Sequence, residues 1–310
     1  MGKNCSTISK ALENMKTSFI TTVLNEEKSI KDLLDSLSQQ TQKPNQVIII
    51  DAGSTDKTVS IVKRYSKKSF PIKLIIKKDL NRSQARNLAV SQAKHNTIVA
   101  SDAGCILDEN WLKRILQPFE NKSINSVAGF YNVQAKTIFQ KCVAPFVAVM
   151  PDKFDVEKFL PSSRSIAFKK AAWQKAGKYP ENLNYCEDLI FAVNLKKNTN
   201  MVIKSSAIVY WKQSENLIQF FKQIQNYAAG DIQANYKPHL KKIYSVFLRY
   251  LAFYILPPLF IFYLFWPILK HFRYIKHPLA FLYLPVIQIV LDLAIISGVF
   301  KSLLVKIKKS

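Results

Sequence analysis

Glycine is scarce in this sequence: 7 of the 310 residues are glycine, and none belongs to a Gly-x-Gly-x-x-Gly turn. Dinucleotide-binding enzymes of the Rossmann type use that turn to hold the cofactor's pyrophosphate, so this class is disfavoured. A glycine-rich loop bearing a lysine is also missing after the first apolar strand. That absence disfavours a nucleotidyltransferase that holds phosphates in such a loop.

Cysteine is rare as well. The four cysteines are far apart and show no Cys-x-x-Cys spacing, so we expect reduced thiols rather than a disulfide or zinc framework. No apolar run precedes Ser18, and no signal peptide is therefore expected. Residues 1–15 are predicted to form a weakly ordered extension.

Acidic residues are outnumbered, 21 against 45 lysines and arginines, which gives a formal net charge of +24. Such a charge suits nucleic acid, an anionic membrane surface or phosphorylated substrates. The sequence has no zinc-finger spacing, no RNA-binding aromatic signature and no basic region leading into heptads, so no nucleic-acid partner is expected. The membrane and phosphate interpretations remain.

The first 110 residues alternate between apolar strand patterns and helical patterns. This alternation predicts a mostly parallel sheet with helices on both faces. The pattern is less regular afterwards, and the apolar stretch 139–150 suits either a membrane or a core. The predicted strands are 18–24, 46–50, 72–76, 97–100, 127–133, 162–168 and 207–211. The predicted helices are 30–37, 58–66, 82–93, 169–176, one opening at 185–188, and 217–234.

The stretch 81–111 organises this first part. Arg82 and Arg86 open a helix, and the strand that follows ends just before Asp102. Open α/β sheets bind ligands at the carboxyl ends of their strands, which makes Asp102 a candidate for a metal or phosphate site. The alternative is an aspartate that only caps the turn before the next helix, near Glu109.

A second pair of acids, Glu187 and Asp188, falls in the first turn of a predicted helix. Acidic side chains at that position also stabilise a helix by complementing its dipole. From the residues alone, a structural and a catalytic role both stay open for this pair.

The composition changes after Tyr244. Residues 246–269 and 278–300 are almost wholly apolar, and each run is long enough to span a bilayer. Aromatic residues crowd the first run, in the manner of membrane-interface belts. We predict a hydrophobic hairpin of two membrane helices. The alternatives are a buried helical pair in a soluble protein, and re-entrant or interfacial helices broken at the prolines.

Seven short motifs follow one another in an order and spacing that resemble family 2 glycosyltransferases of the GT-A fold. The resemblance covers about the first 235 residues. It implies a Rossmann-like, mostly parallel sheet flanked by helices in a domain over 16–240, followed by membrane helices over 241–310. Within that domain, 16–120 would bind the nucleotide sugar and 121–240 the acceptor. The motifs are Asn25-Glu26, Asp51 to Asp56, Ala85-Arg86-Asn87, Asp102-Ala103-Gly104, Ser163-Arg164-Ser165, Glu187-Asp188 and the helix ending Tyr227–Asp231.

The resemblance implies an enzyme that transfers a sugar, with inversion, from a nucleotide-diphosphate sugar to a lipid-linked or envelope polysaccharide acceptor. Asp188 would be the general base with Glu187 beside it, and Asp102 would bind a divalent cation, Mg²⁺ or Mn²⁺. Ser163, Arg164, Gln223 and Tyr227 would line the diphosphate or the acceptor entrance. The donor-binding residues would be Asn25, Glu26, Asp51, Arg82, Arg86 and Asp102.

Two departures from the family pattern stand out. Asp51 is followed by Ala52, where the family has a second, base-recognising aspartate. The Asp-x-Asp metal motif is reduced to Asp102-Ala103-Gly104, and Asp108 is expected to cap a helix rather than replace the lost acid. These departures keep open a non-catalytic protein that binds sugar nucleotides or anionic lipid. In either case we expect a plasma-membrane protein whose transferase domain is cytoplasmic.

Overall fold

The computed structural model describes residues 15–307, so the extension predicted for residues 1–15 lies, apart from Met15, outside the described residues. The chain forms two compact units: unit 1 is Met1–Asn132 with Asp155–Trp211, and unit 2 is Val133–Phe154 with Lys212–Ser310. Each unit draws on two separate stretches of chain. The predicted divisions, 16–120, 121–240 and 241–310, were instead three successive stretches of chain.

The predicted parallel sheet is present at the start of unit 1. The strands β1 (Thr17–Val23), β2 (Gln46–Asp51), β3 (Ile72–Ile76) and β4 (Thr97–Ala100) are mutually parallel, with Ile20 opposite both Ile48 and Ala100. These strands are nearly continuous apolar runs because both faces of the sheet are covered. Their carboxyl ends therefore meet at one edge.

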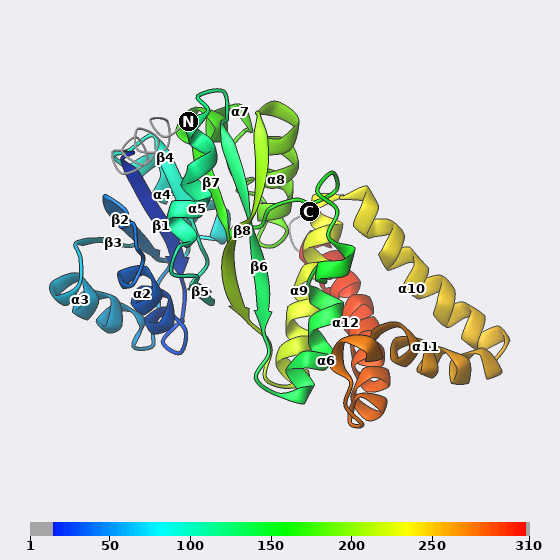
Figure 1. Ribbon diagram of the computed structural model, residues 1–310. Helices are drawn as coiled ribbons and strands as arrows, with labels where there is room; N and C mark the ends of the chain where they lie inside the picture. The colour runs from blue at the N-terminus through cyan, green and yellow to red at the C-terminus, as the bar shows by residue number, and fades with distance from the viewer. Residues whose placement is uncertain (1–14, 308–310) are drawn as a thin grey trace, which may run out of the picture. The chain divides into compact units, whose positions relative to one another are not determined.

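Four further strands extend the sheet beyond β4, in the order β3-β2-β1-β4-β7-β6-β8-β5 (Figure 1). The strand β7 is antiparallel to both β4 and β6, and β5 is antiparallel to β8. The short strand β5 follows directly on the loop that holds Asp102. The added strands are β5 (Cys105–Leu107), β6 (Ser126–Gln134), β7 (Ile166–Lys169) and β8 (Met201–Lys212).

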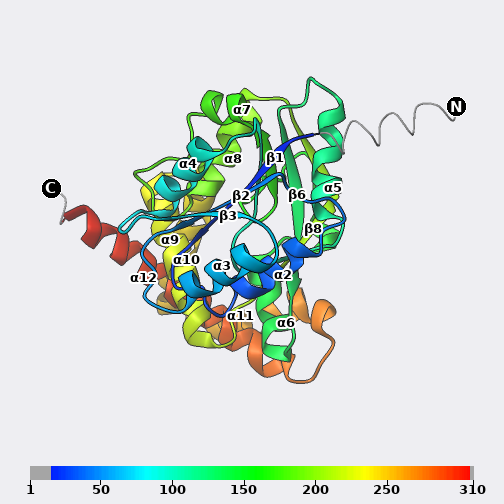
Figure 2. The same ribbon diagram turned by 90° about the vertical axis from the view of Figure 1, so that its left-hand side faces the viewer.

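Helices cover both faces of this sheet, as the strand–helix alternation predicts (Figure 2). One face packs on α2 (Ile30–Ser38), α3 (Thr58–Lys68) and α5 (Trp111–Leu116), which η1 (Gln117–Glu120) extends. The other packs on α4 (Arg82–Gln92), α7 (Lys170–Lys175) and α8 (Glu187–Asn198). Neighbouring strand residues alternate between the two cores, Phe19 facing the first and Ile20 the second.

Local capping fixes where α4 begins. The Asn81 side chain accepts a hydrogen bond from the Gln84 amide at 2.9 Å, and the Gln84 side chain accepts one from the Asn81 amide at 3.0 Å. This reciprocal capping box satisfies two amides that a helix start leaves without partners. It sets Arg86 on the first turns of α4, facing the sheet edge.

Close packing also fixes the strands around Ser165. The Trp111 indole donates to the Ser165 hydroxyl at 2.8 Å, and that hydroxyl donates to the Ala207 carbonyl at 3.1 Å. Any Cβ at Gly129 would collide with the same hydroxyl and approach the Ala207 carbonyl to 2.8 Å. Glycine is therefore required at position 129 for β6, β7 and β8 to come this close.

Unit 2 is built from helices. Cys142, Phe220 and Leu284, from three different helices, lie in one shared apolar core. The helices α9 and α12 lie so close that a Cβ at Gly298 would come within 2.5 Å of the Gln225 carbonyl. The elements are α6 (Ile138–Val147), η2 (Pro151–Lys153), α9 (Leu217–Ala234), α10 (Lys237–Ile255), α11 (Pro258–Ile275) and α12 (Ala280–Ile307).

The membrane hairpin predicted for the C-terminal part needs correction. Residues 246–269 do not form one helix, because α10 ends at Ile255 and α11 begins at Pro258. Pro257 and Pro258 lack backbone donors, and Leu256 before them is pushed out of the helical conformation. Among the described residues, one helix is long and apolar enough to cross a membrane, over Ala280–Leu304 in α12. Core helices of soluble proteins share that property.

Candidate active site

The loops after β1 and β2 are locked together by side-chain hydrogen bonds. The Asn25 side-chain oxygen accepts from the Thr55 amide at 2.9 Å, and the Asn25 amide donates to the Ser54 hydroxyl at 2.9 Å. Asn25 itself has a left-handed backbone with φ 57°. This predicted donor-binding residue thus shapes the loop edge where a donor would bind.

Asp51, at the end of β2, is completely buried. Its Oδ1 accepts hydrogen bonds from the amides of Gly53 and Ser54, both at 2.9 Å. Gly53 has φ +106°, a conformation that other residues rarely adopt. Oδ1 thus holds the turn, while Oδ2 is buried without a hydrogen-bond partner, and contact between Asp51 and the nucleoside stays a prediction.

Arg86 is the centre of the site. Its guanidinium binds the Glu187 carboxylate through Nη1 and Asp102 Oδ1, at 2.9 Å, through Nη2. The side chain is nearly buried and lies 5.5 Å from the centre of the Tyr179 ring. One arginine thereby joins three elements: α4, the carboxyl end of β4 and the first turn of α8.

The charges of this network reinforce one another. Burial alone would lower the pKa of Arg86, but Asp102 and Glu187 outweigh burial and raise that pKa. Burial likewise favours a high pKa for Asp102, yet Arg86 and Arg164 outweigh it and lower the pKa below its ordinary value. Burial raises the pKa of Glu187, against the opposing effect of Arg86. Arg86 is thus permanently charged, and Asp102 is its ionised partner.

A metal would find few protein ligands here. Glu26 is the acid close enough to Asp102 to feel its charge, and burial together with Asp102 raises the pKa of Glu26 although a hydrogen bond from Ser29 lowers it. No group of three or more histidine, cysteine or acidic side chains in residues 15–307 is arranged to hold a metal ion. A Cβ at Gly104 would meet nothing within 4 Å, so space is open beside the Asp102 loop.

Asp188 follows Glu187 at the start of α8, after Cys186 has turned the chain with φ 66°. It is half-buried, and its Oδ1 accepts a hydrogen bond from the Leu189 amide at 2.9 Å. The two adjacent acids are therefore different: Glu187 is buried against Arg86, while Asp188 retains access to solvent. Arg82 is exposed, 5.0 Å from the centre of the Tyr185 ring.

Arg164 is clamped by aromatic rings. Its guanidinium lies 3.7 Å from the centre of the Trp211 ring and 5.3 Å from that of Tyr131. Next to it, the Ser163 hydroxyl is 3.2 Å from that of Tyr179. Sequence reasoning missed Tyr131, Tyr179 and Trp211, and no motif marks these isolated aromatic residues.

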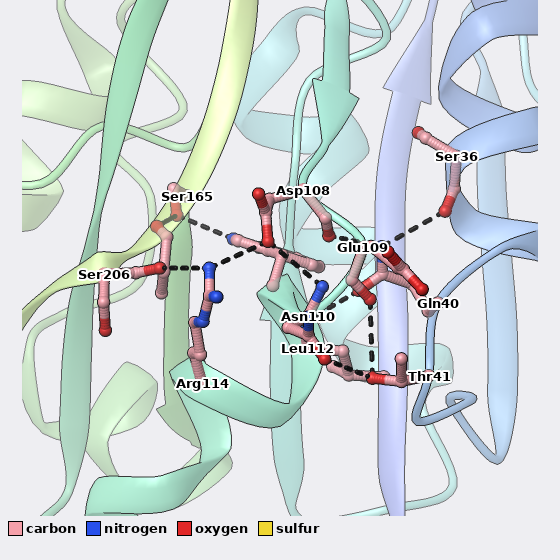
Figure 3. Close-up of polar contacts among 12 residues, drawn as sticks. Ser36, Gln40, Thr41, Asp108, Glu109, Asn110, Leu112, Arg114, Ser165 and Ser206 are labelled. Carbon is pink, nitrogen blue, oxygen red and sulfur yellow. Dashed lines mark hydrogen bonds and ion pairs between the residues drawn. The ribbon is translucent and has the colours of Figure 1, made fainter.

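Asp108 does not replace the missing metal ligand. Its Oδ1 accepts hydrogen bonds from the Asn110 amide at 3.1 Å and from Arg114 at 2.8 Å, in the polar cluster drawn in Figure 3. The same cluster holds Gln40, whose side chain binds the Asp108 carbonyl at 2.7 Å. Asp108 thus holds the turn before α5, but the N-cap of this helix is Asn110, and no side-chain cap hydrogen bond is formed there.

Gln223 and Tyr227 belong to unit 2, on α9. The Gln223 side chain accepts from the Ser214 hydroxyl at 2.7 Å and donates to the Tyr227 hydroxyl at 3.2 Å. These contacts hold the two predicted acceptor residues beside each other on one face of the helix.

Residues 18–161 match the family model described as Glycosyl transferase family 2. This segment belongs to that glycosyltransferase family. All the loops built around β1, β2 and β4 lie within the matched segment.

The curated relatives include a transferase named for the O-antigen chain and a synthase of a poly-N-acetylglucosamine. The chain is 24% identical over 199 residues to the O-antigen chain rhamnosyltransferase RfbN of Salmonella typhimurium, covering 58% of the chain and 61% of that protein. It is 25% identical over 122 residues to the poly-beta-1,6-N-acetyl-D-glucosamine synthase of Staphylococcus epidermidis, covering 39% and 29%. The chain thus spans less than two thirds of either relative.

Solved structures show that this chain has the GT-A fold. A mannosyltransferase from Pyrobaculum calidifontis, in complex with GDP-Man and Mn²⁺, superposes with a TM-score of 0.64 at 14% identity, covering 94% of this chain and 88% of that one. Residues 1–349 of S. aureus TarS, in complex with UDP-GlcNAc, give 0.53 at 20% identity, covering 69% and 66%. The α/β fold expected from the sequence is confirmed.

Proposed function

We propose that this protein transfers a sugar, with inversion, from a nucleotide-diphosphate sugar to a lipid-linked or envelope polysaccharide acceptor. The observation that carries the proposal is the meeting of Arg86, Asp102 and Glu187, with Asp188 beside them, at the carboxyl edge of the parallel strands. Ligands of open α/β sheets bind at that edge. The names of the relatives support nucleotide-sugar donors and envelope acceptors.

The leaving group explains why arginines gather here. Departure of a nucleoside diphosphate develops negative charge that preorganised cations must stabilise. Arg86 is held in place by two carboxylates, Arg82 is exposed beside it, and the aromatic clamp orients Arg164. In this proposal the three guanidiniums bind the diphosphate, with Ser163 at its edge.

Charge balance in the site favours a divalent cation. Three guanidiniums (Arg82, Arg86 and Arg164) stand against four carboxylates (Glu26, Asp102, Glu187 and Asp188), so the protein alone offers a diphosphate no surplus of positive charge. Mg²⁺ and Mn²⁺ suit such a site, because hard cations can be held by one or two carboxylates together with substrate phosphates. Asp102 would hold the cation, which when bound neutralises charge on the diphosphate. Glu26, whose pKa the charge of Asp102 helps to raise, would be a second acid near the cation.

Asp188 is the proposed general base. Inverting transfer requires a group that accepts the proton of the attacking acceptor hydroxyl. Asp188 has the access to solvent that such a group needs, whereas Glu187 is occupied by Arg86. We therefore assign Glu187 to positioning Arg86 and the start of α8.

The acceptor side of the proposal involves unit 2. Gln223 and Tyr227 would line the acceptor entrance, and the apolar helices α10 to α12 would keep the enzyme at the membrane where a lipid-linked acceptor resides. Nucleotide sugars are made in the cytosol, so the transferase unit would face the cytoplasm. A cysteine at Leu279, in a background without native cysteines, tests this location: it should resist an impermeant thiol reagent in intact cells and react after lysis.

A donor screen tests the function itself. Full-length protein in detergent is incubated with UDP-, GDP- and dTDP-sugars and with prenyl-phosphate or glycolipid acceptors. We expect one donor to be consumed, more slowly in EDTA and at least a hundredfold more slowly in Asp188→Asn. Donor binding without any turnover would instead support a non-catalytic sugar-nucleotide-binding protein. Activity unchanged by EDTA would leave the leaving group to the arginines alone.

A further inference from the structure

The helices α10 and α11 expose an unusually apolar surface. Tyr254 is 86% exposed, Leu269 78% and Phe262 72%. Soluble proteins rarely expose contiguous apolar patches of this kind without a partner. Further exposed members of the same two helices are Tyr244, Leu248, Leu251, Ile255, Leu259, Phe260, Ile261, Phe265 and Trp266.

The two helices meet at a bend around Pro257, called the elbow below, and diverge from it (Figure 1). Arg249 on α10 hydrogen-bonds the Tyr263 hydroxyl on α11, and nearer the elbow the Phe253 ring lies 5.5 Å from that of Phe260. Two turns further from the elbow, the corresponding positions are Lys242 on α10 and Lys270 on α11. Each lies on the same helix face as the residue that joins the helices.

A third lysine, Lys153, comes from η2. The Asp152 carboxylate accepts hydrogen bonds from Arg273 at 2.5 Å and from the Tyr274 hydroxyl at 2.8 Å, which fixes η2 against the last turns of α11. Lys153, the next residue in η2, therefore lies near Lys270. Burial and the charges of Lys153, Lys242 and Arg249 lower the pKa of Lys270.

The positive charges of Lys153, Lys242 and Lys270 are not neutralised by the nearby acids of unit 2. Asp152 is paired with Arg273, and Asp292 on α12 with Arg249. Among the described residues, no ion pair with a carboxylate is formed by Lys153, Lys242 or Lys270. All three side chains are exposed, and like charges near one another repel, so an anion that binds between them would relieve that repulsion.

We propose that Lys153, Lys242 and Lys270 bind the phosphate headgroup of an anionic membrane phospholipid, whose acyl chains lie along the exposed apolar faces of α10 and α11. The aromatic residues beside the lysines suit the same depth, because tyrosine and tryptophan concentrate at the boundary between headgroups and hydrocarbon. The assignment rests on the membrane association in the proposed function but not on sugar transfer. It gives α10 and α11 a place within one leaflet rather than across the bilayer.

Native mass spectrometry of the full-length protein released from detergent tests the site. Phosphatidic acid and phosphatidylcholine with identical acyl chains are titrated separately, and bound lipid is counted. A basic residue near a membrane surface is worth about fivefold in binding. Lys242→Gln with Lys270→Gln should therefore weaken phosphatidic acid binding roughly 30-fold and leave phosphatidylcholine binding unchanged, while the corresponding arginine variants retain the preference.

The matched control removes the same charge elsewhere. Lys63→Gln with Lys67→Gln, on exposed positions of α3 in unit 1, should leave lipid binding as in the wild type. An equal loss in this control would assign the effect to the net charge of +24 and overturn the site. Inorganic phosphate that binds the cluster as tightly as phosphatidic acid would overturn the lipid assignment. Donor hydrolysis in the same samples reports separately on the proposed function.

Discussion

Both units contain an arginine that is paired with a buried carboxylate, and the two networks are built differently. In unit 1, Arg86 binds Glu187 and Asp102 at the edge of a sheet where ligands have access. In unit 2, Arg249 and the fully buried Asp292 are joined through the Tyr263 hydroxyl, with Gln288 also bonded to Asp292 at 3.2 Å. In the first network Glu187 is buried and Asp102 is about one-third exposed, whereas the second network lies among three apolar helices.

The difference shows how to distinguish a substrate-binding network from a network that only holds helices together. Burying an ion pair seldom adds stability over an apolar pair of the same shape, although breaking it is costly. The Arg249–Asp292 pair therefore specifies how α10, α11 and α12 meet. The Arg86 network also holds elements together, but its acids lie where a substrate would bind. Removing charge from one network should affect stability, and removing charge from the other should affect turnover.

The largest effect is expected at the proposed base. Asp188→Asn should reduce transfer by about 10²–10⁴-fold, because the acceptor hydroxyl loses its proton acceptor. Nucleotide affinity and thermal unfolding should stay close to those of the wild type. The control is Asp155→Asn, an exposed acid of unit 1 paired with Lys158 at 2.9 Å. Transfer within about threefold of wild type would move the base to another residue.

The next effect concerns stability. Arg249→Met leaves the Asp292 carboxylate buried without its cation and should lower the free energy of unfolding by about 3–5 kcal/mol. Arg273→Met breaks an ion pair of which both members are about half exposed, so about 0–1 kcal/mol is expected. Chemical denaturation in detergent measures both. Equal losses of unfolding free energy in the two variants would contradict the structural role of Arg249.

Replacing both members of an ion pair by apolar residues distinguishes the two networks further. Arg249→Met with Asp292→Leu should recover most of the lost stability, to within about 1–2 kcal/mol of wild type, because no unpaired charge remains. Arg86→Met with Glu187→Leu should also fold, yet transfer no sugar. Unfolding curves and donor turnover are measured on both double variants. Turnover by the second would remove Arg86 from the site.

The smallest effect depends on pH. Arg86 and Arg164 outweigh burial and hold the pKa of Asp102 below 3.8. An acid with a lower pKa in the folded than in the unfolded state adds stability above about pH 4, and this contribution is lost as the pH falls through the folded-state pKa. Asp102→Asn should therefore flatten the acid limb of the stability curve. Glu120→Gln, an exposed acid, serves as the control, and an identical acid limb in both variants would contradict the pairing.

The sequence was sufficient for the order of the first strands and helices. The strands β1, β2 and β4 are largely buried, β3 at the sheet edge is partly exposed, and the helices have apolar faces, so local pattern and final position agree. The strand β5 escaped notice because its three residues, Cys105–Leu107, are held only by pairing with β8 about a hundred positions later. Non-local pairing of so short a segment leaves no periodic signal.

The site was predictable in its residues but not in its contacts. Motif order places Arg86, Asp102 and Glu187 among the functional residues, yet nothing local indicates that one guanidinium would hold both acids. The enclosure of Asp51 and the clamp of Trp211 on Arg164 likewise depend on tertiary packing. In the C-terminal part, hydropathy alone predicted one continuous helix over residues 246–269. Pro257 and Pro258 interrupt the backbone there, so the structure has two helices, α10 and α11.

The position of β7 between β4 and β6 has a consequence for synthesis on the ribosome. The strands β1 to β4 are complete at residue 100, but β4 keeps an open edge until residues 166–169 emerge to pair with it. At roughly 5–20 residues per second, that interval lasts several seconds. An unpaired apolar edge can capture a strand of another chain, so the nascent chain is open to such pairing during that interval. Arg86 can pair with Glu187 only after β7 has been synthesised.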